Sequence, residues 1–111
     1  MFQKLTANDV FFVDSSHVLK VGSDLSKIFF SILPALQSGV LIHMHDMFWP
    51  FEYPKSMIAE GRNWNELYLV RSFLQNNDSF EILFFSSWLA LMLNSGEQLC
   101  QHISILSPGI L

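Results

Sequence analysis

The chain has 111 residues, half of them apolar and 14% charged, which suffices for one domain and excludes intrinsic disorder. The net charge of −4, without a basic cluster or an apolar run long enough to span a bilayer, argues against nucleic-acid and membrane partners. A single cysteine, Cys100, excludes a disulfide framework and a multi-cysteine zinc site, so we expect a reducing, cytoplasmic setting.

Two short strands joined by a helix are predicted in the first half of the chain. Residues 10–13 form a continuous apolar run, which is typical of a strand buried on both faces. Ser23 begins a helix as its N-cap, and apolar residues follow at helical spacing over residues 25–36, where Pro34 should loosen the last turn. Residues 40–44 form a second buried strand, and a crossover of this length implies that the two strands are parallel.

A long aromatic loop is predicted in the middle of the chain. Residues 47–62 contain two prolines, one glycine and four aromatic residues. Loops of this length in a compact domain are usually functional when they are not disordered. Trp49, Glu52 and Tyr53 are therefore candidates for a lid or a substrate wall, and simple packing of the aromatic rings is the alternative.

A helix, a third strand and the start of a fourth follow this loop. Asn63 and Glu66 have the spacing of a capping box, so we expect a helix from there to about residue 75. Residues 80–85 form a third buried strand, and residues 110–111 look like the beginning of another.

Ionisable residues follow both of the first two predicted strands. Asp14 and His17 come after residues 10–13, and His45 and Asp46 come after the second strand. Because the carboxyl ends of parallel strands meet at one edge of a sheet, these side chains should lie close together. Asp14, His45 and Asp46 supply oxygen ligands and one imidazole, a set that suits Mg²⁺, Mn²⁺ or a similar divalent ion. His17, with an ordinary pKa of about 6.5, suits a general base.

The same residues also have plainer explanations. Aspartates at strand ends commonly cap the following loop, and this role stays open for Asp14 and Asp46. His43 lies deeper in its strand and is expected to be a buried histidine that donates to a carbonyl group. The chain has no G-x-G-x-x-G turn, no P-loop and no G-x-S-x-G motif, and Cys100 lacks the setting of a nucleophile.

A series of short motifs runs in order through residues 8–88. They are VFFVDSSH at 10–17, VGSD at 21–24, LP at 33–34, HD at 45–46, PFEYP at 50–54, EGR at 60–62, WNE at 64–66 and YL at 68–69. Together these motifs resemble class I S-adenosylmethionine-dependent methyltransferases. The resemblance implies an α/β, partial Rossmann-like methyltransferase fold, in which residues 1–111 are a single partial domain, the carboxyl-terminal half.

The resemblance also implies a place for each strand. Class I methyltransferases have a mainly parallel sheet with flanking helices and the strand order 3-2-1-4-5-7-6. Residues 10–13, 40–44 and 80–85 would be the fourth, fifth and sixth strands, and residues 110–111 would begin the antiparallel seventh. The first three strands carry the main contacts to S-adenosylmethionine in this family, and no residue of this chain matches them.

The activity that the resemblance implies is methyl transfer to a small-molecule acceptor such as an oxygen nucleophile, with the isolated chain inactive. In metal-dependent O-methyltransferases of this class, acidic residues that end strands four and five hold a divalent ion. By position these match Asp14 and the pair His45 and Asp46, although many relatives have a second acid in place of His45. His17 stands where some relatives have a catalytic base.

Two other functions remain open. A strand at residues 10–13 without its usual neighbour would leave an apolar edge that recruits another chain, so we expect a homo-oligomer. This edge and the 11 phenylalanines favour a non-catalytic oligomeric interaction module. A metal-dependent hydrolase that uses Asp14, His45 and Asp46 is the second alternative.

Overall fold

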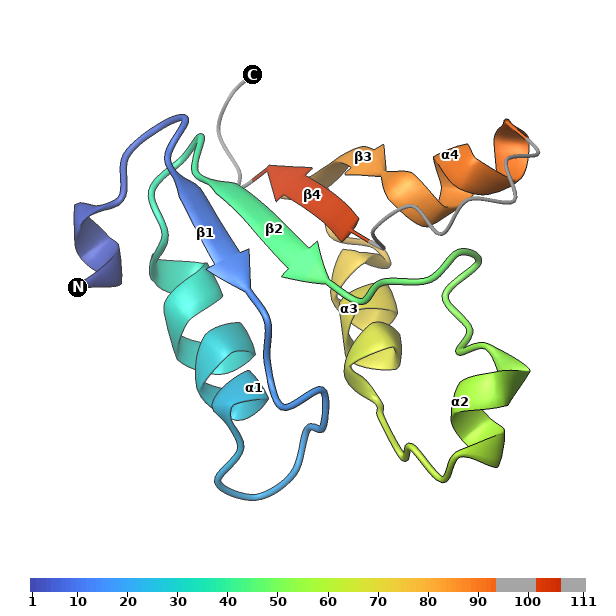
Figure 1. The fold of residues 1–111 in the computed structure, drawn as a ribbon. Coiled ribbons are helices and arrows are strands. Elements are labelled where there is room, and N and C mark those ends of the chain that lie inside the picture. The colour runs from blue at the N-terminus through green and yellow to red at the C-terminus, as the bar shows by residue number, and fades with distance from the viewer. Residues whose placement is uncertain (94–101, 107–111) are drawn as a thin grey trace.

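The computed structural model describes residues 1–93 and the strand at residues 102–106. Its centre is a sheet with the order β1-β2-β4-β3 (Figure 1), formed by β1 (Val10–Val13), β2 (Leu41–His45), β4 (His102–Leu106) and β3 (Glu81–Phe85). β1 and β2 pair in parallel, whereas β4 is antiparallel to both β2 and β3. Three strands therefore run in one direction, and β4 runs in the opposite direction between two of them.

The α/β class and the parallel pair of β1 and β2 are confirmed, and three of the four described strands run in the same direction. Insertion of β4 makes the other two ladders antiparallel. The sequence analysis placed the start of an antiparallel strand at residues 110–111, which lie outside the described residues, and it missed the strand at His102–Leu106.

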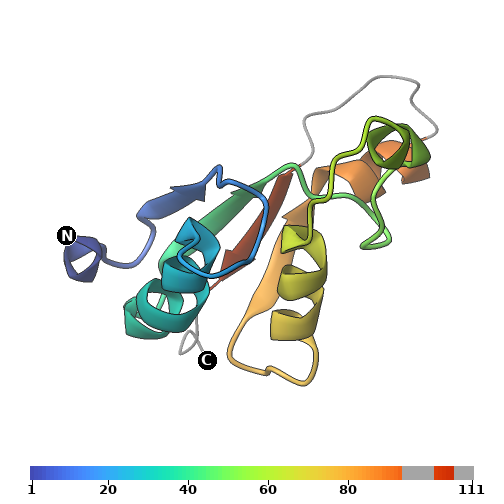
Figure 2. The same ribbon diagram turned by 90° about the horizontal axis from the view of Figure 1, so that it is seen from below.

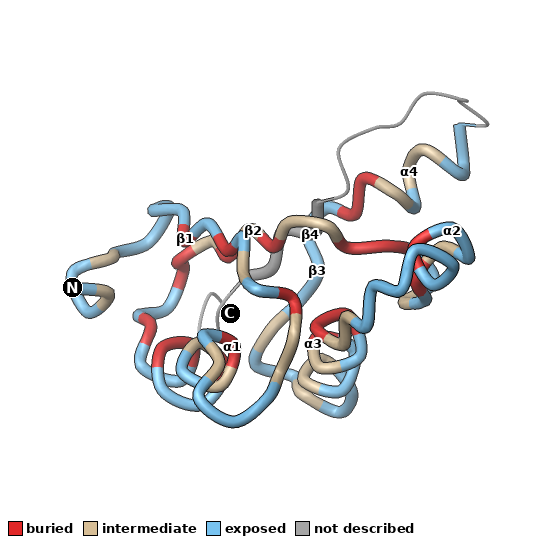
Figure 3. Tube along the Cα trace, turned by 60° about the horizontal axis from the view of Figure 1, so that its bottom comes forward, coloured by how far each residue is buried: buried red, intermediate tan, exposed pale blue. Residues whose placement is uncertain are grey.

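Burial on both faces of the predicted strands is wrong. Phe11 and Val13 of β1 are buried, whereas Val10 and Phe12 on the opposite face are 54% and 53% exposed. β2 alternates in the same way, and β3 is exposed along most of its length. The reason is that the described helices α1 and α3 lie on the same side of the sheet (Figures 2 and 3). A continuous apolar run does not reveal that only one face is covered.

The helix predicted to follow Ser23 forms as three consecutive segments. They are α1 (Asp24–Lys27), the π-helical η2 (Ile28–Ile32) and the 3₁₀ turn η3 (Leu33–Ala35). The Ser23 hydroxyl accepts a hydrogen bond from the Ser26 amide at 3.4 Å, so the predicted N-cap is confirmed. Pro34 lies in η3, so the α-helical pattern ends there, but the last turn tightens into a 3₁₀ turn and is not loosened as predicted. The predicted apolar stripe packs into the core through Leu25, Phe29, Ile32, Leu33 and Leu36.

The second half of the chain contains three helices among the described residues. They are α2 (Lys55–Ala59), α3 (Glu66–Leu74) and α4 (Ser86–Met92), and a 3₁₀ turn, η1 (Phe2–Lys4), lies near the N-terminus. α2 interrupts the predicted loop. α3 begins with Asn65 at its N-cap position, so the predicted capping box of Asn63 and Glu66 is wrong. Among the described residues, no helix is both long and apolar enough to cross a bilayer.

Candidate functional site

The predicted cluster of ionisable residues forms at the carboxyl ends of β1 and β2. The parallel register pairs Val13 with Met44, so the next residues in each strand, Asp14 and His45, come side by side. The Oδ1 atom of Asp14 lies 3.8 Å from Nδ1 of His45. Asp46 follows at the end of β2, and its backbone has a positive φ of 57° that turns the chain away from the sheet.

His17 completes this cluster. Its Nε2 atom lies 3.5 Å from Oδ1 of Asp14 and 3.6 Å from Oδ2 of Asp46. One ligand atom from each of Asp14, His17 and Asp46 falls within 4.8 Å of the other two. His45 lies beside this group, with its Nδ1 atom 3.2 Å from Oδ1 of Asp46. The structure thus places His17, predicted as a base, in a group of three residues whose atoms could hold a metal ion.

Glu66 contacts this cluster, and the sequence analysis did not predict that contact. Its Oε2 atom lies 2.7 Å from Nδ1 of His17, and its side chain is only 1% exposed. Burial raises the pKa of the Glu66 carboxyl, while hydrogen bonds with His17 and Ser15 oppose that rise. The residue that appeared to cap a helix in the sequence instead holds the imidazole of His17.

The loop that carries His17 is fastened to the start of α3. The His17 carbonyl accepts hydrogen bonds from the backbone amides of Asn65 at 3.0 Å and Glu66 at 3.2 Å. The Asn65 side chain accepts from the Leu19 amide at 2.6 Å and donates to the Leu19 carbonyl at 3.2 Å. His17 itself has a positive φ of 60°, a conformation that non-glycine residues adopt at a cost. These bonds hold that conformation in place.

Asp24, the first residue of α1, fixes the same loop from the other side. Its carboxylate accepts hydrogen bonds from the hydroxyl of Ser16 and, at 2.8 Å, from the Ser16 amide. It also accepts from the Leu25 amide at 2.9 Å. The bond from the Ser16 hydroxyl is the main reason that the pKa of Asp24 lies below its ordinary value. The loop between β1 and α1 is therefore held from two sides, by the start of α3 and by the start of α1.

An aromatic ring covers the buried imidazole. Trp64 stacks on His17 with ring centroids 3.9 Å apart and planes inclined by 20°. The guanidinium group of Arg62 lies 5.3 Å from the Trp64 ring centroid, on which it makes a cation–π contact. His17 is consequently only 8% exposed, whereas the Asp14 side chain is 53% exposed. Solvent and small molecules can reach the cluster from the Asp14 side.

The three predicted loop residues lie in different environments. Tyr53 is buried, and its hydroxyl accepts a hydrogen bond from the Leu67 amide at 2.9 Å in the first turn of α3. Burial raises the pKa of Tyr53 to about 12. Glu52 is exposed and accepts a hydrogen bond from the Tyr68 hydroxyl at 2.8 Å. Trp49 is partly exposed and packs edge to face on Phe85 at 5.8 Å.

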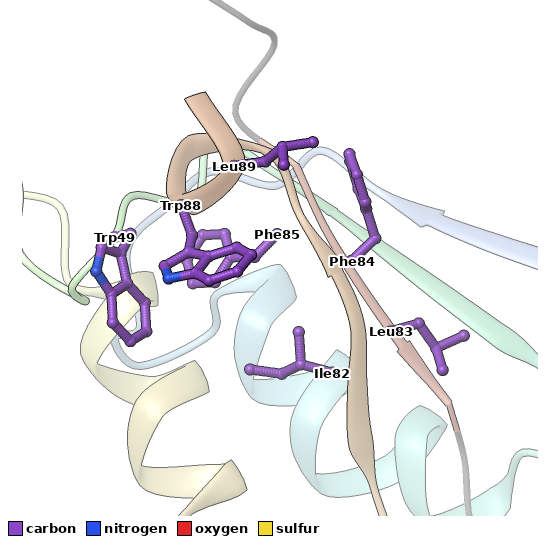
Figure 4. A pocket seen from close by; sticks show the side chains of 7 residues that line it. All are labelled: Trp49, Ile82, Leu83, Phe84, Phe85, Trp88 and Leu89. Carbon is purple, nitrogen blue, oxygen red and sulfur yellow. The ribbon is translucent and has the colours of Figure 1, made fainter. Parts of the chain in front are cut away.

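Trp49 also lines an apolar cavity of about 300 Å³ between the loop after β2 and the β3–α4 segment. Figure 4 shows its lining side chains, which are Trp49, Ile82, Leu83, Phe84, Phe85, Trp88 and Leu89. None of them is ionisable, so this cavity offers apolar contact and stacking but no acid–base or metal-binding group. The group that could carry chemistry is the cluster around His17.

The cluster contains the elements of a divalent-cation site. Two carboxylates and one imidazole converge, and among the described residues all the ion pairs of Asp14, Asp46 and Glu66 are with histidines. A cation between the three ligand atoms would offset this concentration of negative charge. His43 lies outside the group, packs edge to face on Phe12 at 5.2 Å, and has a pKa lowered by burial. Comparison of the chain with protein-family models, curated proteins and solved structures finds no match.

Proposed function

We propose that this chain is the carboxyl-terminal part of an S-adenosylmethionine-dependent methyltransferase that acts on a small-molecule hydroxyl group. In this proposal, the cluster of Asp14, His17 and Asp46 binds a divalent cation that orients the acceptor oxygen. The observation that carries the proposal is the position of this cluster at the carboxyl ends of adjacent parallel strands, within a sheet of unusual strand order.

The order and direction of the strands support the proposal. If β1, β2 and β3 are the fourth, fifth and sixth strands of a class I methyltransferase, the seventh should lie between the fifth and the sixth and run antiparallel to both. β4 has this place and this direction. The motifs that resemble this family lie within residues 8–88, and β4 lies outside them at His102–Leu106.

The open face and edge of β1 fit the same proposal. β1 pairs only with β2 among the described strands, and Val10 and Phe12 are about half exposed. An apolar edge strand with one uncovered face is the place where further strands and helices would pack. The contacts to S-adenosylmethionine in the resembled family come from such strands, so we assign no residue of this chain to that cofactor.

The residues of the cluster fit a divalent cation better than they fit a free general base. The Nε2 atom of His17 faces two carboxylates at 3.5 and 3.6 Å, under the Trp64 ring. A bound cation would lower the pKa of an acceptor hydroxyl and so favour loss of its proton to solvent, and S-adenosylmethionine, when bound, would supply the methyl group. In this proposal Asp14 and Asp46 hold the cation, and the exposed side of Asp14 admits the acceptor.

The test begins with the reading frame upstream of the Met1 codon. The proposal predicts an in-frame segment encoding strands, the first of them followed by a glycine-rich turn. The extended protein should bind S-adenosylmethionine and methylate a small-molecule hydroxyl, and Asp14→Asn should abolish transfer without weakening cofactor binding. Asp78→Asn, in an exposed turn, is the matched control. Submicromolar binding of S-adenosylmethionine by the 111-residue chain alone, or an upstream frame without such a segment, would contradict the proposal.

A non-catalytic interaction module is the second candidate function. It is favoured by the half-exposed Val10 and Phe12 on an edge strand, which could pair with a second copy of the chain. Both candidate functions allow the chain to form an oligomer. They differ in whether the cluster of Asp14, His17 and Asp46 binds a divalent ion. Retention of a divalent ion supports the enzyme, whereas an oligomer that binds no ion supports the module.

A further inference from the structure

The two ring nitrogens of His17 face different partners. Nδ1 lies 2.7 Å from the buried carboxylate of Glu66, which is hydrogen-bond distance. Nε2 faces Asp14 and Asp46 at 3.5 and 3.6 Å, which is too long for good hydrogen bonds. The imidazole is therefore bound on one side and directed, without a close partner, into the cluster on the other.

This geometry favours one tautomer of His17. If the Nδ1–H group donates to Glu66, the Nε2 atom carries a lone pair that points toward the two aspartates. A lone pair facing two carboxylates is electrostatically unfavourable unless a proton or a metal cation lies between them. Histidines that bind metal ions commonly donate their other N–H group to a carboxylate in this way.

We infer that Glu66 is a positioning residue that holds His17 as a neutral nitrogen ligand, so that the site selects a divalent transition metal over Mg²⁺ or Ca²⁺. One imidazole and two carboxylates suit ions such as Mn²⁺, Co²⁺ or Zn²⁺, whereas Mg²⁺ and Ca²⁺ prefer oxygen ligands alone. The inference rests on the cation site of the proposed function, and it does not depend on methyl transfer.

The surroundings of the ring keep this orientation fixed before any ion binds. Glu66 is 1% exposed and His17 is 8% exposed, so neither side chain can turn freely into solvent. Trp64 stacks on the imidazole, and the His17 carbonyl is bound to the amides of Asn65 and Glu66. The start of α3 thus fixes the orientation of the His17 ring before an ion binds. The free-energy cost of ordering the ring is met when the chain folds.

The test is titration of the purified, tag-free chain with Co²⁺, followed through its visible absorption and in competition with Mg²⁺, Mn²⁺ and Zn²⁺. The wild-type chain should bind one ion, with an affinity that rises from Mn²⁺ through Co²⁺ to Zn²⁺ and is weakest for Mg²⁺. Glu66→Gln preserves the size of the side chain and removes its charge, and it should weaken Co²⁺ binding by about 10- to 100-fold. Glu81→Gln, the same change at an exposed position in β3, should leave the affinity unaltered.

A readout independent of affinity separates positioning from general damage to the fold. Long-range ¹H–¹⁵N spectra should show His17 protonated at Nδ1 in the wild-type chain with Zn²⁺ bound, and a mixture of ring states in Glu66→Ala. If Glu66→Ala does not fold, the Co²⁺ affinity of Glu66→Gln decides the question, because this variant keeps the size of the side chain and loses only the charge that faces Nδ1.

The possible outcomes distinguish this inference from the proposal beneath it. No binding of any divalent ion would overturn both the cation site and the role of Glu66. Binding that is lost in His17→Asn but unchanged in Glu66→Gln would leave the site intact and overturn the positioning role. Equal or tighter binding of Mg²⁺ would overturn the assignment of metal class.

Discussion

Glu66 and His17 lie 49 positions apart in the chain, and their side chains meet at 2.7 Å in the core of the molecule. The contact joins the start of α3 to the loop after β1, and it directs the second ring nitrogen of His17 toward Asp14 and Asp46. One chain of contacts thus runs from the buried Glu66 carboxylate through the buried His17 imidazole to Asp14 and Asp46. These two carboxylates are less buried and lie at the carboxyl edge of the sheet.

Removal of the Tyr53 hydroxyl should destabilise the fold. Tyr53→Phe leaves the Leu67 amide, at the start of α3, without its acceptor, and loss of such a bond to a buried donor costs about 1–3 kcal/mol. Tyr68→Phe is the matched control, because its hydroxyl bonds to Glu52 at the surface, and it should change stability by less than about 0.5 kcal/mol. Urea denaturation measures both values, and equal effects would contradict a capping role for Tyr53.

Asp24 should contribute a pH-dependent part of the stability. Its pKa is lowered in the folded state, chiefly by the Ser16 hydroxyl, so its contribution is present above the unfolded pKa of about 4 and is lost as the pH falls through the lower folded value. Asp24→Asn should therefore lower the free energy of unfolding at pH 7. Its deficit against the wild type should shrink below about pH 4. Denaturation at several pH values checks this, with Asp78→Asn as a control, and a deficit that persists unchanged at low pH would count against it.

The helix after Ser23 should be held mainly by its buried stripe. Leu25 is fully buried, so Leu25→Ala should cost about 2–5 kcal/mol through lost contacts and the cavity left behind. Val21 is fully exposed, and Val21→Ala should stay within about 0.5 kcal/mol of the wild type. Thermal or urea unfolding gives the comparison. A small effect at Leu25 would mean that the packing of α1 against the sheet is loose.

The open edge of β1 should drive self-association. The chain should sediment as an oligomer at tens of micromolar, and Phe12→Lys should shift it toward the monomer, because a charge on the exposed face disfavours apolar association. Val21→Lys introduces the same charge at an exposed loop position and should leave the oligomer intact. A monomeric wild-type chain at that concentration would refute the predicted homo-oligomer.

Local signals in the sequence were sufficient to predict much of the fold. The Ser23 cap and the apolar spacing over residues 25–36 each depend on neighbours within a few positions, and both appear in the structure. The cover of each sheet face was not predictable in this way. Val10 and Phe12 are as apolar as Phe11 and Val13, and only the packing of α1 and α3 decides which of them are buried.

The candidate site likewise has one part that the sequence pattern predicts and another that depends on contacts between distant segments. The convergence of Asp14 and Asp46 follows from the parallel pairing of two adjacent strands, so the sequence analysis could predict it. The role of Glu66 depends on a contact across 49 positions, while its spacing from Asn63 gave a plausible local explanation. The one available signal was Glu66 itself, an acidic residue at the start of a predicted helix. Such a residue can either cap the helix or bind a partner elsewhere in the fold.

The most direct test of the cation site is calorimetric titration of the chain with Mn²⁺, compared with the double variant Asp14→Asn and Asp46→Asn. Asparagine tolerates the positive φ of 57° at position 46, so the double variant removes both charges with little backbone strain. The cation site predicts that the wild-type chain binds one ion and that the double variant loses this binding while keeping its fold. A wild-type chain that binds no ion, or a double variant that binds as well as the wild type, would contradict it.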